Sequence, residues 1–348
     1  MIDERDTRDV SGSAGALDAQ GGLGPARGRR EVEPEMENTI DEPFPLVYAI
    51  TLNWNGKDDT LELLDSLRRL DYPHYRVLVV DNGSEDGSVE AIRRVFPDVT
   101  VIENGKNLGY ADGFNVGLEY AYQQGADYFL ILNNDTMIDP SAMMALVKVA
   151  EQDGEIGFVS GKVYLYQDPD RLQTVGRHND PMILAGNHVG GGEVDRGQYD
   201  RVQDYDFIDD VYLLVRREVY EDVGGYDPNF FLYYEETDWC ARVRRAGYRI
   251  VFAPGAKIWH KGNISGASTT RSPERHYFMT RNRVIFMARN TSTRQLVRYL
   301  LWSLGSEALE AARYVKHGYF RHPIARLRGL GSGLLWLVKN GRTDGARA

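Results

Sequence analysis

The fold can be inferred outward from one segment, LVYAITLNWNG, which runs from Leu46 to Gly56. Residues 46–52 form a continuous run of apolar, aromatic and β-branched side chains, and the run ends in the polar cluster that begins at Asn53. A run of this kind indicates a strand buried on both faces, as in a parallel sheet with helices on each side. The polar residues mark the end of the strand.

The pattern of a short apolar strand followed by an amphipathic helix repeats along the next hundred residues. Asp58 and Asp59 are placed to cap the first helix. The sequence predicts strands at 77–80, 99–102 and 128–132 and helices at 61–67, 89–95 and 109–124. Strands that alternate with helices at this spacing build βαβ units, so we expect an α/β protein with a mixed, mostly parallel sheet.

The alternation continues less regularly after residue 136. The expected elements are helices at 140–151 and 236–246 and strands at 156–166, 211–215 and 249–253. Residues 167–206 are polar and glycine-rich and are expected to form an irregular loop. A loop this long in a compact domain is usually functional.

Polar clusters follow three of the first four predicted strands, at 53–55, 81–84 and 133–136. Ligands of open α/β sheets bind outside the carboxyl ends of the strands, so we expect the three clusters to converge on one crevice. Asp81 could accept a hydrogen bond from a sugar hydroxyl or a base N–H, and a plain turn explains this cluster equally well.

Two other segments have residue types suited to phosphates and cations. The stretch from Asn107 to Asn115 places small residues such as Gly109 at a helix start, where backbone amides favour anions; a helix entry eased by glycine is the alternative. Asp135 lies just after the strand predicted at 128–132, which has the clearest apolar run, and His260 follows a later strand. Together they could bind Mg²⁺ or Mn²⁺. The alternatives are a helix cap and a structural histidine.

Three acids, Glu235, Glu236 and Asp238, fall within four residues at a predicted helix start. The helix dipole favours acids at this end, so simple capping is one explanation. Capping does not explain the apolar and aromatic residues 230–234 directly before them. A carboxylate beside apolar surface has a raised pKa and is suited to act as a general base.

Taken in order, these segments resemble glycosyltransferase family 2, the inverting enzymes with a GT-A fold, and within it the rhamnosyltransferase-type branch. The resemblance covers about residues 47–289. It rests on seven segments, at 50–55, 79–84, 107–115, 132–136, 224–227, 231–238 and 259–260.

The resemblance implies a Rossmann-like nucleotide-diphospho-sugar transferase with a C-terminal helical extension. Asp81, with the backbone near Thr51 and Asn53, would hold the base and ribose. Asp135 would end the metal-binding motif, and His260 would complete the Mg²⁺ or Mn²⁺ site. The other donor-site positions that the resemblance implies are Asn82, Asn107, Gly109, Asn115, Asn133 and Asn134.

The sequence departs from the family pattern at two positions. Asn133 stands where the metal-binding motif has its first acid, which weakens the charge of the site. The catalytic Glu-Asp pair falls on Glu235 and Glu236, so Glu236 is the expected base, and Asp238 is a rival for that role.

The implied reaction moves a sugar from dTDP-rhamnose, or from a UDP- or GDP-sugar, to a hydroxyl of a lipid-linked or surface-glycan acceptor. Such products serve cell-surface polysaccharide biosynthesis or protein glycosylation. A nucleotidyltransferase is an alternative enzyme class, but residues 53–57 do not supply its glycine-rich phosphate loop. A non-catalytic nucleotide-sugar-binding partner is a further alternative.

Composition excludes several classes of protein. The chain has 348 residues, of which 42% are apolar and 26% charged, as in ordinary globular proteins. No segment approaches the roughly 18 apolar residues of a membrane-spanning helix. The single cysteine, Cys240, excludes an internal disulfide. The first residues lack a signal-peptide pattern, so we expect a cytoplasmic protein.

Charge is divided unevenly along the chain. The net charge is −10, yet residues 269–348 hold 15 basic and 4 acidic side chains. The acidic remainder argues against nucleic-acid binding. Apolar stretches with a tryptophan, at 296–302 and 334–338, lie among the arginines and suit an anionic membrane surface. We expect peripheral membrane contact through 290–340; packing on the catalytic domain or pairing of two subunits is the alternative.

These observations divide the chain into three parts. Residues 1–43 are predicted to be a disordered acidic tail. Residues 44–268 form the catalytic domain, with a nucleotide-sugar-binding half at 44–136 and an acceptor and catalytic half at 137–268. Residues 269–348 form the basic, amphipathic helical region.

Overall fold

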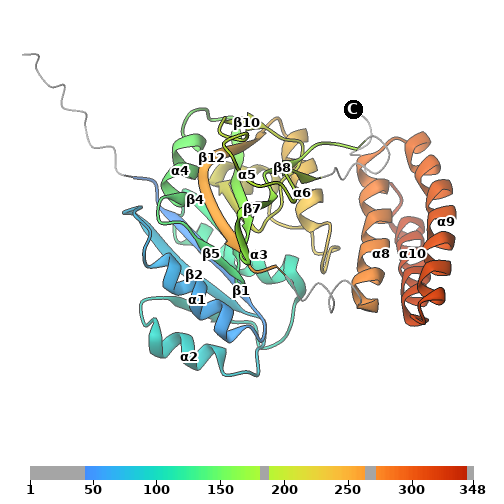
Figure 1. Cartoon of the computed structure of the whole chain (residues 1–348), viewed down its shortest axis with the longest axis horizontal. Helices are drawn as coiled ribbons and strands as arrows, with labels where there is room; N and C mark the ends of the chain where they lie inside the picture. The colour runs from blue at the N-terminus through green and yellow to red at the C-terminus, as the bar shows by residue number, and fades with distance from the viewer. Residues whose placement is uncertain (1–43, 181–187, 263–271, 343–348) are drawn as a thin grey trace, which may run out of the picture. The chain divides into compact units, whose positions relative to one another are not determined.

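The computed structural model describes residues 44–180, 188–262 and 272–342 (Figure 1). The predicted tail at 1–43 lies outside the described residues. The described helices are α1 (Lys57–Leu67), α2 (Ser88–Val95), α3 (Gly109–Gln123), α4 (Ala142–Ala150), α5 (Arg217–Val223), α6 (Glu235–Arg245), α8 (Pro273–Asn290), α9 (Thr293–Lys316) and α10 (Arg321–Asn340).

One large mixed sheet forms the centre of the α/β region. Its strands are β1 (Val47–Asn53), β2 (Tyr75–Asp81), β3 (Thr100–Glu103), β4 (Tyr128–Asn133), β5 (Thr136–Ile138), β6 (Ile156–Leu165), β7 (Asp168–Thr174), β10 (Gln203–Asp204), β11 (Tyr212–Arg216) and β12 (Arg249–His260). The order is β10-β12-β6-β11-β4-β1-β2-β3, with β5 on β12 and β7 on β6. Strands β1 to β4 pair in parallel, whereas β11 is antiparallel to β4 and β6. The predicted mixed, mostly parallel sheet is confirmed, and its parallel core is the set β1 to β4.

The sheet is covered on both faces because alternate side chains of each strand enter different cores. Ile50 of β1 belongs to one core with Phe114 of α3. Its neighbour Ala49 belongs to the other core with Leu63 of α1 and Leu146 of α4. All five side chains are buried. The continuous apolar run of β1 thus follows from its position between two layers of helices.

Strand register sets which residues meet at the carboxyl edge. Asn53 of β1 pairs with Asp81 of β2, and Leu52 pairs with Asn133 of β4. At the far end of β12, His260 pairs with Thr136 of β5. Three polar strand ends and a distant histidine are therefore brought to the same region.

The expectation of an irregular loop at 167–206 is wrong in part. The strand β7 runs antiparallel to β6, and short strands β8 (Gly176–Arg177) and β9 (His188–Val189) pair with each other. The strand β7 reads DPDRLQT, with Pro169 and three charged residues, because it lies at a sheet edge where charge and proline are tolerated. Strand β12 also continues to His260, past a register shift between Ala253 and Lys257.

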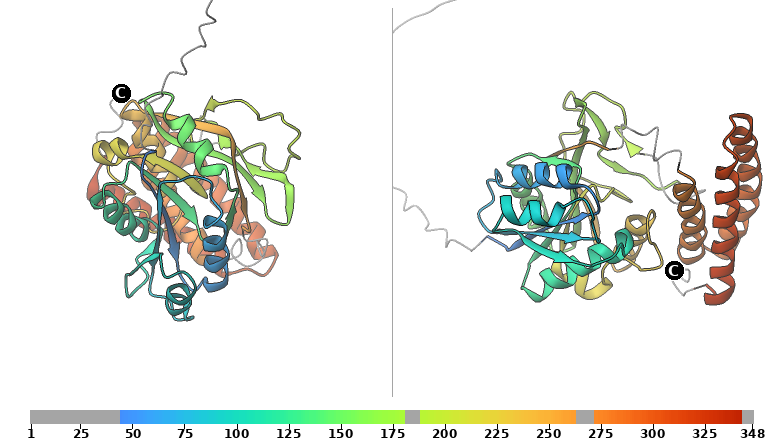
Figure 2. Two further views of the ribbon diagram at one scale, coloured as in Figure 1. Left: turned by 90° about the vertical axis from the view of Figure 1, so that its left-hand side faces the viewer. Right: turned by 90° about the horizontal axis from the view of Figure 1, so that it is seen from below.

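The C-terminal region is helical, as predicted. Helix α8 lies between the α/β region and the pair α9 and α10, and it packs along α10 (Figure 2). Asn282 of α8 donates hydrogen bonds to the carbonyl oxygens of Leu232 (2.9 Å) and Tyr233 (2.8 Å). Arg289 forms an ion pair with Asp227. Helix α8 therefore holds the segment that leads into α6.

Candidate active site

Side chains from three strand ends form one hydrogen-bonded network. The Asn53 amide donates to Asp81 Oδ2 (2.7 Å), and Asp81 Oδ1 accepts from the backbone N–H groups of Gly83 (3.0 Å) and Ser84 (2.8 Å). Asn134 Nδ2 lies 3.4 Å from Asn53 Oδ1. The predicted convergence of the three polar clusters is confirmed.

The predicted residues Asn82, Asn107 and Gly109 support the start of α3. Asn82 donates to the Gly109 carbonyl (2.9 Å), and Asn107 Oδ1 accepts from the Gly109 N–H (2.8 Å). Gly109 has φ +86°, and a Cβ there would lie 2.5 Å from the ring of Phe231. Tyr110 N–H donates to the Phe231 carbonyl (2.8 Å). Only glycine permits this close approach between the start of α3 and the segment before α6.

The side chains of two predicted donor-site residues, Asn115 and Thr51, do not take part in the hydrogen bonds described above. Asn115 donates to the Tyr226 carbonyl (2.8 Å) and accepts from its N–H (2.9 Å), so its side chain fastens the 224–227 segment to α3. Thr51 is buried in β1, and no described residue supplies a hydrogen-bond partner for its hydroxyl. A direct contact of either side chain with a donor remains a prediction.

The predicted metal ligands Asp135 and His260 are in contact. His260 Nε2 lies 3.2 Å from Asp135 Oδ1, and His260 Nδ1 lies 2.8 Å from Gln173 Oε1. An amide oxygen can only accept, so Nδ1 carries a proton in this contact. Burial opposes ionisation, but the hydrogen bond with His260 lowers the pKa of Asp135 below its usual value. A carboxylate beside a ring nitrogen is a donor set that Mg²⁺ or Mn²⁺ accepts.

Further metal ligands would have to come from water or from a bound donor. Among the described residues, no group of three or more His, Cys, Asp or Glu side chains could hold a metal ion. Asn133, at the position of the family's first acid, accepts a hydrogen bond from the Tyr110 hydroxyl (3.0 Å). Mg²⁺ and Mn²⁺ sites that use substrate phosphates commonly have one or two protein ligands, so this donor set fits such a cation.

The segment before α6 is held in an unusual backbone conformation. Tyr233 and Tyr234 have φ values of +68° and +72°, which non-glycine residues adopt at some cost. The two hydrogen bonds from Asn282 and the Tyr234–Phe286 ring contact brace this turn from α8. The turn directs the first residues of α6 towards the start of α3. Strain of this kind concentrates at functional sites.

The three predicted acids of α6 have different environments. Asp238 is fully buried and accepts a hydrogen bond from Arg242 Nε (2.8 Å), as an ion pair within the helix. Glu235 is 4% exposed, and burial together with Glu236 and Asp210 raises its pKa. The Glu236 side chain is 16% exposed and lies 3.0 Å from Arg177 Nη2. Glu236 is thus the acid of this group with the most access to solvent.

Sequence reasoning missed three residues of this cluster, Arg177, Asp209 and Asp210. Arg177 Nε lies 3.2 Å from Asp209 Oδ1. Burial and the charge of Glu236 raise the pKa of Asp210 to about 7. Two consecutive acids directly before an apolar strand were a signal for the aspartates. Nothing in the local sequence distinguishes Arg177.

Tyr110 connects the carboxyl edge of the sheet with the acidic cluster. Its hydroxyl lies 3.0 Å from Asn133 Oδ1 and 3.4 Å from the carbonyl oxygen of Asp210. The Tyr226 hydroxyl donates to Asp210 Oδ2 (2.8 Å). The strand-end network and the acids of α6 therefore belong to one site.

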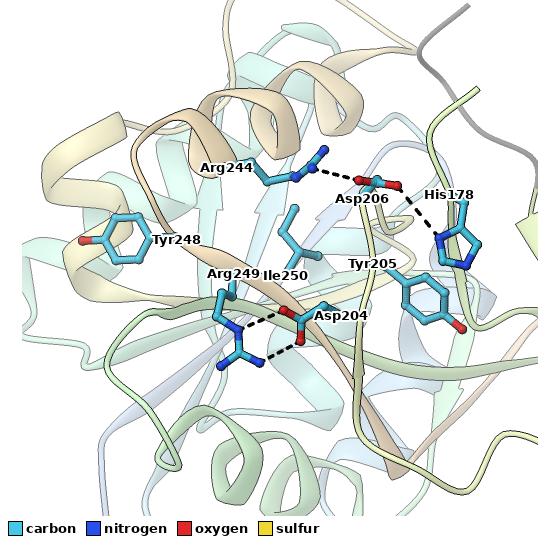
Figure 3. Close-up of a pocket in the computed structure, with 8 residues that line it drawn as sticks. All are labelled: His178, Asp204, Tyr205, Asp206, Arg244, Tyr248, Arg249 and Ile250. Carbon is cyan, nitrogen blue, oxygen red and sulfur yellow. Dashed lines mark hydrogen bonds and ion pairs between the residues drawn. The ribbon is translucent and has the colours of Figure 1, made fainter. Parts of the chain in front are cut away.

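A hollow of about 200 Å³ lies beside strands β10 and β12 and is separate from this network (Figure 3). Its charged side chains are paired with one another. Arg249 pairs with Asp204 (2.7 Å), and Arg244 pairs with Asp206 (2.8 Å). None of the predicted site residues lines this hollow, so we do not assign the chemistry to it.

Comparison with known proteins agrees with the geometry. The model of glycosyl transferase family 2 matches residues 48–224, which is half of the chain and includes the strand-end network. The chain belongs to glycosyl transferase family 2. It is therefore a glycosyltransferase, and the expected resemblance is confirmed.

Two curated relatives of this family 2 chain are rhamnosyltransferases. It is 29% identical over 220 residues to the N-acetylglucosaminyl-diphospho-decaprenol L-rhamnosyltransferase of Mycobacterium tuberculosis, covering 58% of this chain and 70% of the relative. It is 24% identical over 254 residues to the dTDP-rhamnosyl transferase RfbF of Shigella flexneri, and the match covers 70% of this chain and 80% of the relative. These similarities place it in the rhamnosyltransferase-like branch.

A solved structure supports the GT-A fold. The mannosyltransferase PcManGT from Pyrobaculum calidifontis, in complex with GDP-Man and Mn²⁺, superposes with a TM-score of 0.54 at 17% identity. The match covers 83% of this chain and 87% of the other. At this identity the likeness is evidence for the fold alone.

Proposed function

We propose that this family 2 enzyme transfers rhamnose from dTDP-rhamnose, with inversion, to a hydroxyl of a lipid-linked glycan acceptor. The names of the two relatives support this donor and acceptor class. The observation that carries the proposal is the link through Tyr110 between the strand-end residue Asn133 and Asp210, whose carboxyl is influenced electrostatically by Glu236 of α6. It joins a nucleotide-binding edge to a cluster of carboxyl groups within one site.

Glu236 is the proposed general base. Its Oε1 is engaged by Arg177 and by the Thr237 hydroxyl (2.8 Å), whereas Oε2 has no hydrogen-bond partner among the described residues. Asp238 is fully buried and paired with Arg242, so we assign it a structural role. Glu235 is deeply buried, and burial raises its pKa, which disfavours the charged form that a general base needs.

The proposed reaction is a single in-line displacement. Glu236 takes the proton of the acceptor hydroxyl, and the acceptor oxygen forms a bond to the anomeric carbon. The bond between that carbon and the diphosphate oxygen breaks, and the electron pair leaves with the nucleoside diphosphate. Asp81 and Asn53 hold the nucleoside end of the donor, so that the reacting atoms are oriented before the step.

Asp135 and His260 are the residues that would hold Mg²⁺ or Mn²⁺. A bound cation would offset the charge that develops on the departing nucleoside diphosphate. Gln173 accepts the Nδ1 proton of His260 and holds the ring with Nε2 3.2 Å from the Asp135 carboxylate.

Thermal unfolding with added ligands tests the donor site. Because a ligand of the native state raises the melting temperature, dTDP with Mn²⁺ should raise it more than UDP or GDP with Mn²⁺. Asp135→Ala should remove the metal-dependent part of the rise. The matched control is Asp98→Ala, an exposed acid outside the site. The absence of any shift with all three nucleotides would contradict the donor-site assignment.

Product analysis tests the reaction class. Incubation with dTDP-rhamnose and a lipid-linked glycan should yield the rhamnosylated lipid and dTDP. Release of pyrophosphate would instead indicate a nucleotidyltransferase. Donor binding without any product would favour a non-catalytic nucleotide-sugar-binding protein.

We also propose that α10 rests on an anionic membrane surface. Its exposed apolar side chains lie three, seven and four residues apart, on one helix face, with Ile324, Leu327, Leu334 and Val338 all between 37% and 81% exposed. No helix among the described residues is long and apolar enough to cross a membrane. The protein should co-sediment with vesicles containing phosphatidylglycerol and not with pure phosphatidylcholine vesicles. Leu327→Glu should abolish co-sedimentation; equal recovery of variant and wild type would overturn this proposal.

A further inference from the structure

A groove of about 910 Å³ opens between the first turns of α8 and residues 321–335 of α10. This volume lies within the range of ligand-binding pockets. Its apolar lining includes Phe278 of α8 and Ile324, Ala325 and Leu335 of α10. None of the family-matched segments in the catalytic domain lines it.

Two arginines give the groove a positive charge. Arg321 and Arg328 line it from α10, and both are exposed. No described acid forms an ion pair with either of them, whereas nearby Arg326 is paired with Glu307. Glu274 also lines the groove, and its carboxylate accepts a hydrogen bond from Ser272 (2.5 Å). Two basic groups at the mouth of an apolar groove suit a ligand with phosphate next to a hydrocarbon chain.

Two stacked rings connect the wall of the groove with the segment before α6. Phe278, in the groove wall, stacks on Phe231 with 5.2 Å between ring centroids and 18° between planes. Phe231 in turn contacts the start of α3, where its carbonyl accepts from Tyr110 N–H. A molecule in the groove would therefore lie next to the segment that leads into the acids of α6.

The other end of the groove meets the exposed apolar face of α10. Ile324 belongs to both, because it lines the groove and is also part of the stripe with Leu327 and Val338. A hydrocarbon chain could pass from a membrane surface along this stripe into the groove at Ile324, next to Arg321 and Arg328.

We propose that this groove binds the phosphorylated polyprenyl chain of the lipid-linked acceptor. The chain would pack on Phe278, Ile324 and Leu335, and the phosphate groups would face Arg321 and Arg328. The inference rests on the proposed function, because it assigns a place to the acceptor of that reaction. It adds a binding site in the C-terminal helices, outside the residues matched by the family model.

Farnesyl diphosphate is a suitable probe because it contains the diphosphate and a short isoprenoid chain. Binding to the full-length protein can be followed by the fluorescence of Trp336, which lies next to Leu335 on α10. We expect Arg321→Gln/Arg328→Gln and Ile324→Glu each to weaken binding about 10-fold. The matched controls Lys339→Gln and Leu301→Glu, on exposed positions that do not line the groove, should stay within twofold of wild type.

Competition identifies the place of binding. Saturating dTDP should leave farnesyl diphosphate binding unchanged, and farnesol should bind at least 10-fold more weakly. Displacement by dTDP, or equal affinity of the groove variants and wild type, would overturn the proposal.

A transfer assay separates this inference from the proposed function. The groove variants should have a raised KM for a polyprenyl-diphosphate acceptor and an unchanged kcat/KM for a soluble acceptor with the same sugar on a short alkyl chain. Equal losses with both acceptors would contradict the groove assignment. If wild type transfers to neither acceptor, the proposed function fails, and the farnesyl diphosphate result alone decides whether the groove binds such lipids.

Discussion

Arg177 Nη2 lies 3.0 Å from Glu236 Oε1 in the buried part of the site. The same guanidinium lies 3.2 Å from Asp209 through Nε, and it donates to the carbonyl oxygen of Ile208 (3.3 Å). Burial opposes ionisation of Asp209, but Arg177 and His188 lower its pKa to about 2. One arginine therefore compensates two acids and fixes the side chain that we propose as the base.

Replacing Arg177 with methionine should lower the free energy of unfolding by about 3–5 kcal/mol. The reason is that Asp209 and Glu236 would be left without a buried cation. Urea denaturation measures the change. The matched control is Arg244→Met, which removes a more exposed ion pair with Asp206 and should cost no more than about 1 kcal/mol. Similar losses for the two variants would contradict the role assigned to Arg177.

Replacing Glu236 with glutamine should reduce kcat by about 10²–10⁴-fold while the affinity for dTDP is retained. The amide keeps the size of the side chain and cannot take the acceptor proton. Asp238→Asn should instead reduce stability, because it removes the buried carboxylate that pairs with the partly buried Arg242. Product formation at saturating donor and thermal unfolding separate the two effects. Full kcat in Glu236→Gln would exclude it as the base.

Much of the catalytic domain could be predicted because its local signals agree. The buried run at 46–52 and the polar strand ends are dictated by parallel pairing, and register then brings Asn53 and Asp81 together. By contrast, β7 was not predicted. Its side chains are set by a sheet edge, where the alternation of apolar and polar residues is weak.

The roles of the site residues could be predicted only in part from the sequence. Glu235, Glu236 and Asp238 were visible as a group, but which acid is buried depends on partners far along the chain. Arg177 reaches Glu236 across 59 residues, and Arg242 pairs with Asp238 within the helix. Long-range contacts of a single arginine leave no periodic signal, so the roles of the three acids required the structure.

Gln173 should influence metal affinity without contacting the metal. It accepts the Nδ1 proton of His260 and so fixes the ring with Nε2 towards Asp135. Gln173→Leu should weaken Mn²⁺ binding about 10–100-fold, as measured by calorimetry or by the electron paramagnetic resonance signal of free Mn²⁺. Gln198→Leu, on the same polar stretch but with exposed partners, should bind Mn²⁺ as wild type does. Unchanged Mn²⁺ affinity in Gln173→Leu would exclude His260 as an oriented ligand.

Asp210 should make the stability of the enzyme depend on pH. Burial and Glu236 raise its pKa from 3.8 to about 7 in the folded protein. Below about pH 4 the carboxyl is protonated in both the folded and unfolded states, so its ionisation does not lower the free energy of unfolding. As pH rises to about 7, the unfolded state loses the proton and the folded state keeps it. The contribution of this group to the free energy of unfolding therefore falls across pH 4–7 and is constant above that range.

Asp210→Asn removes this titration and keeps an acceptor for the Tyr226 hydroxyl. The variant should match wild type near pH 4 and be more stable at pH 8, by about 2–4 kcal/mol, since each pKa unit corresponds to about 1.4 kcal/mol. Denaturant unfolding at pH 4.5, 6 and 8 measures the difference. Asp98→Asn, at an exposed position, should differ from wild type by the same small amount at each pH. A difference for Asp210→Asn that is flat across this range would show that the carboxyl is ionised in the folded protein, and the acidic cluster would then need a compensating cation beyond Arg177.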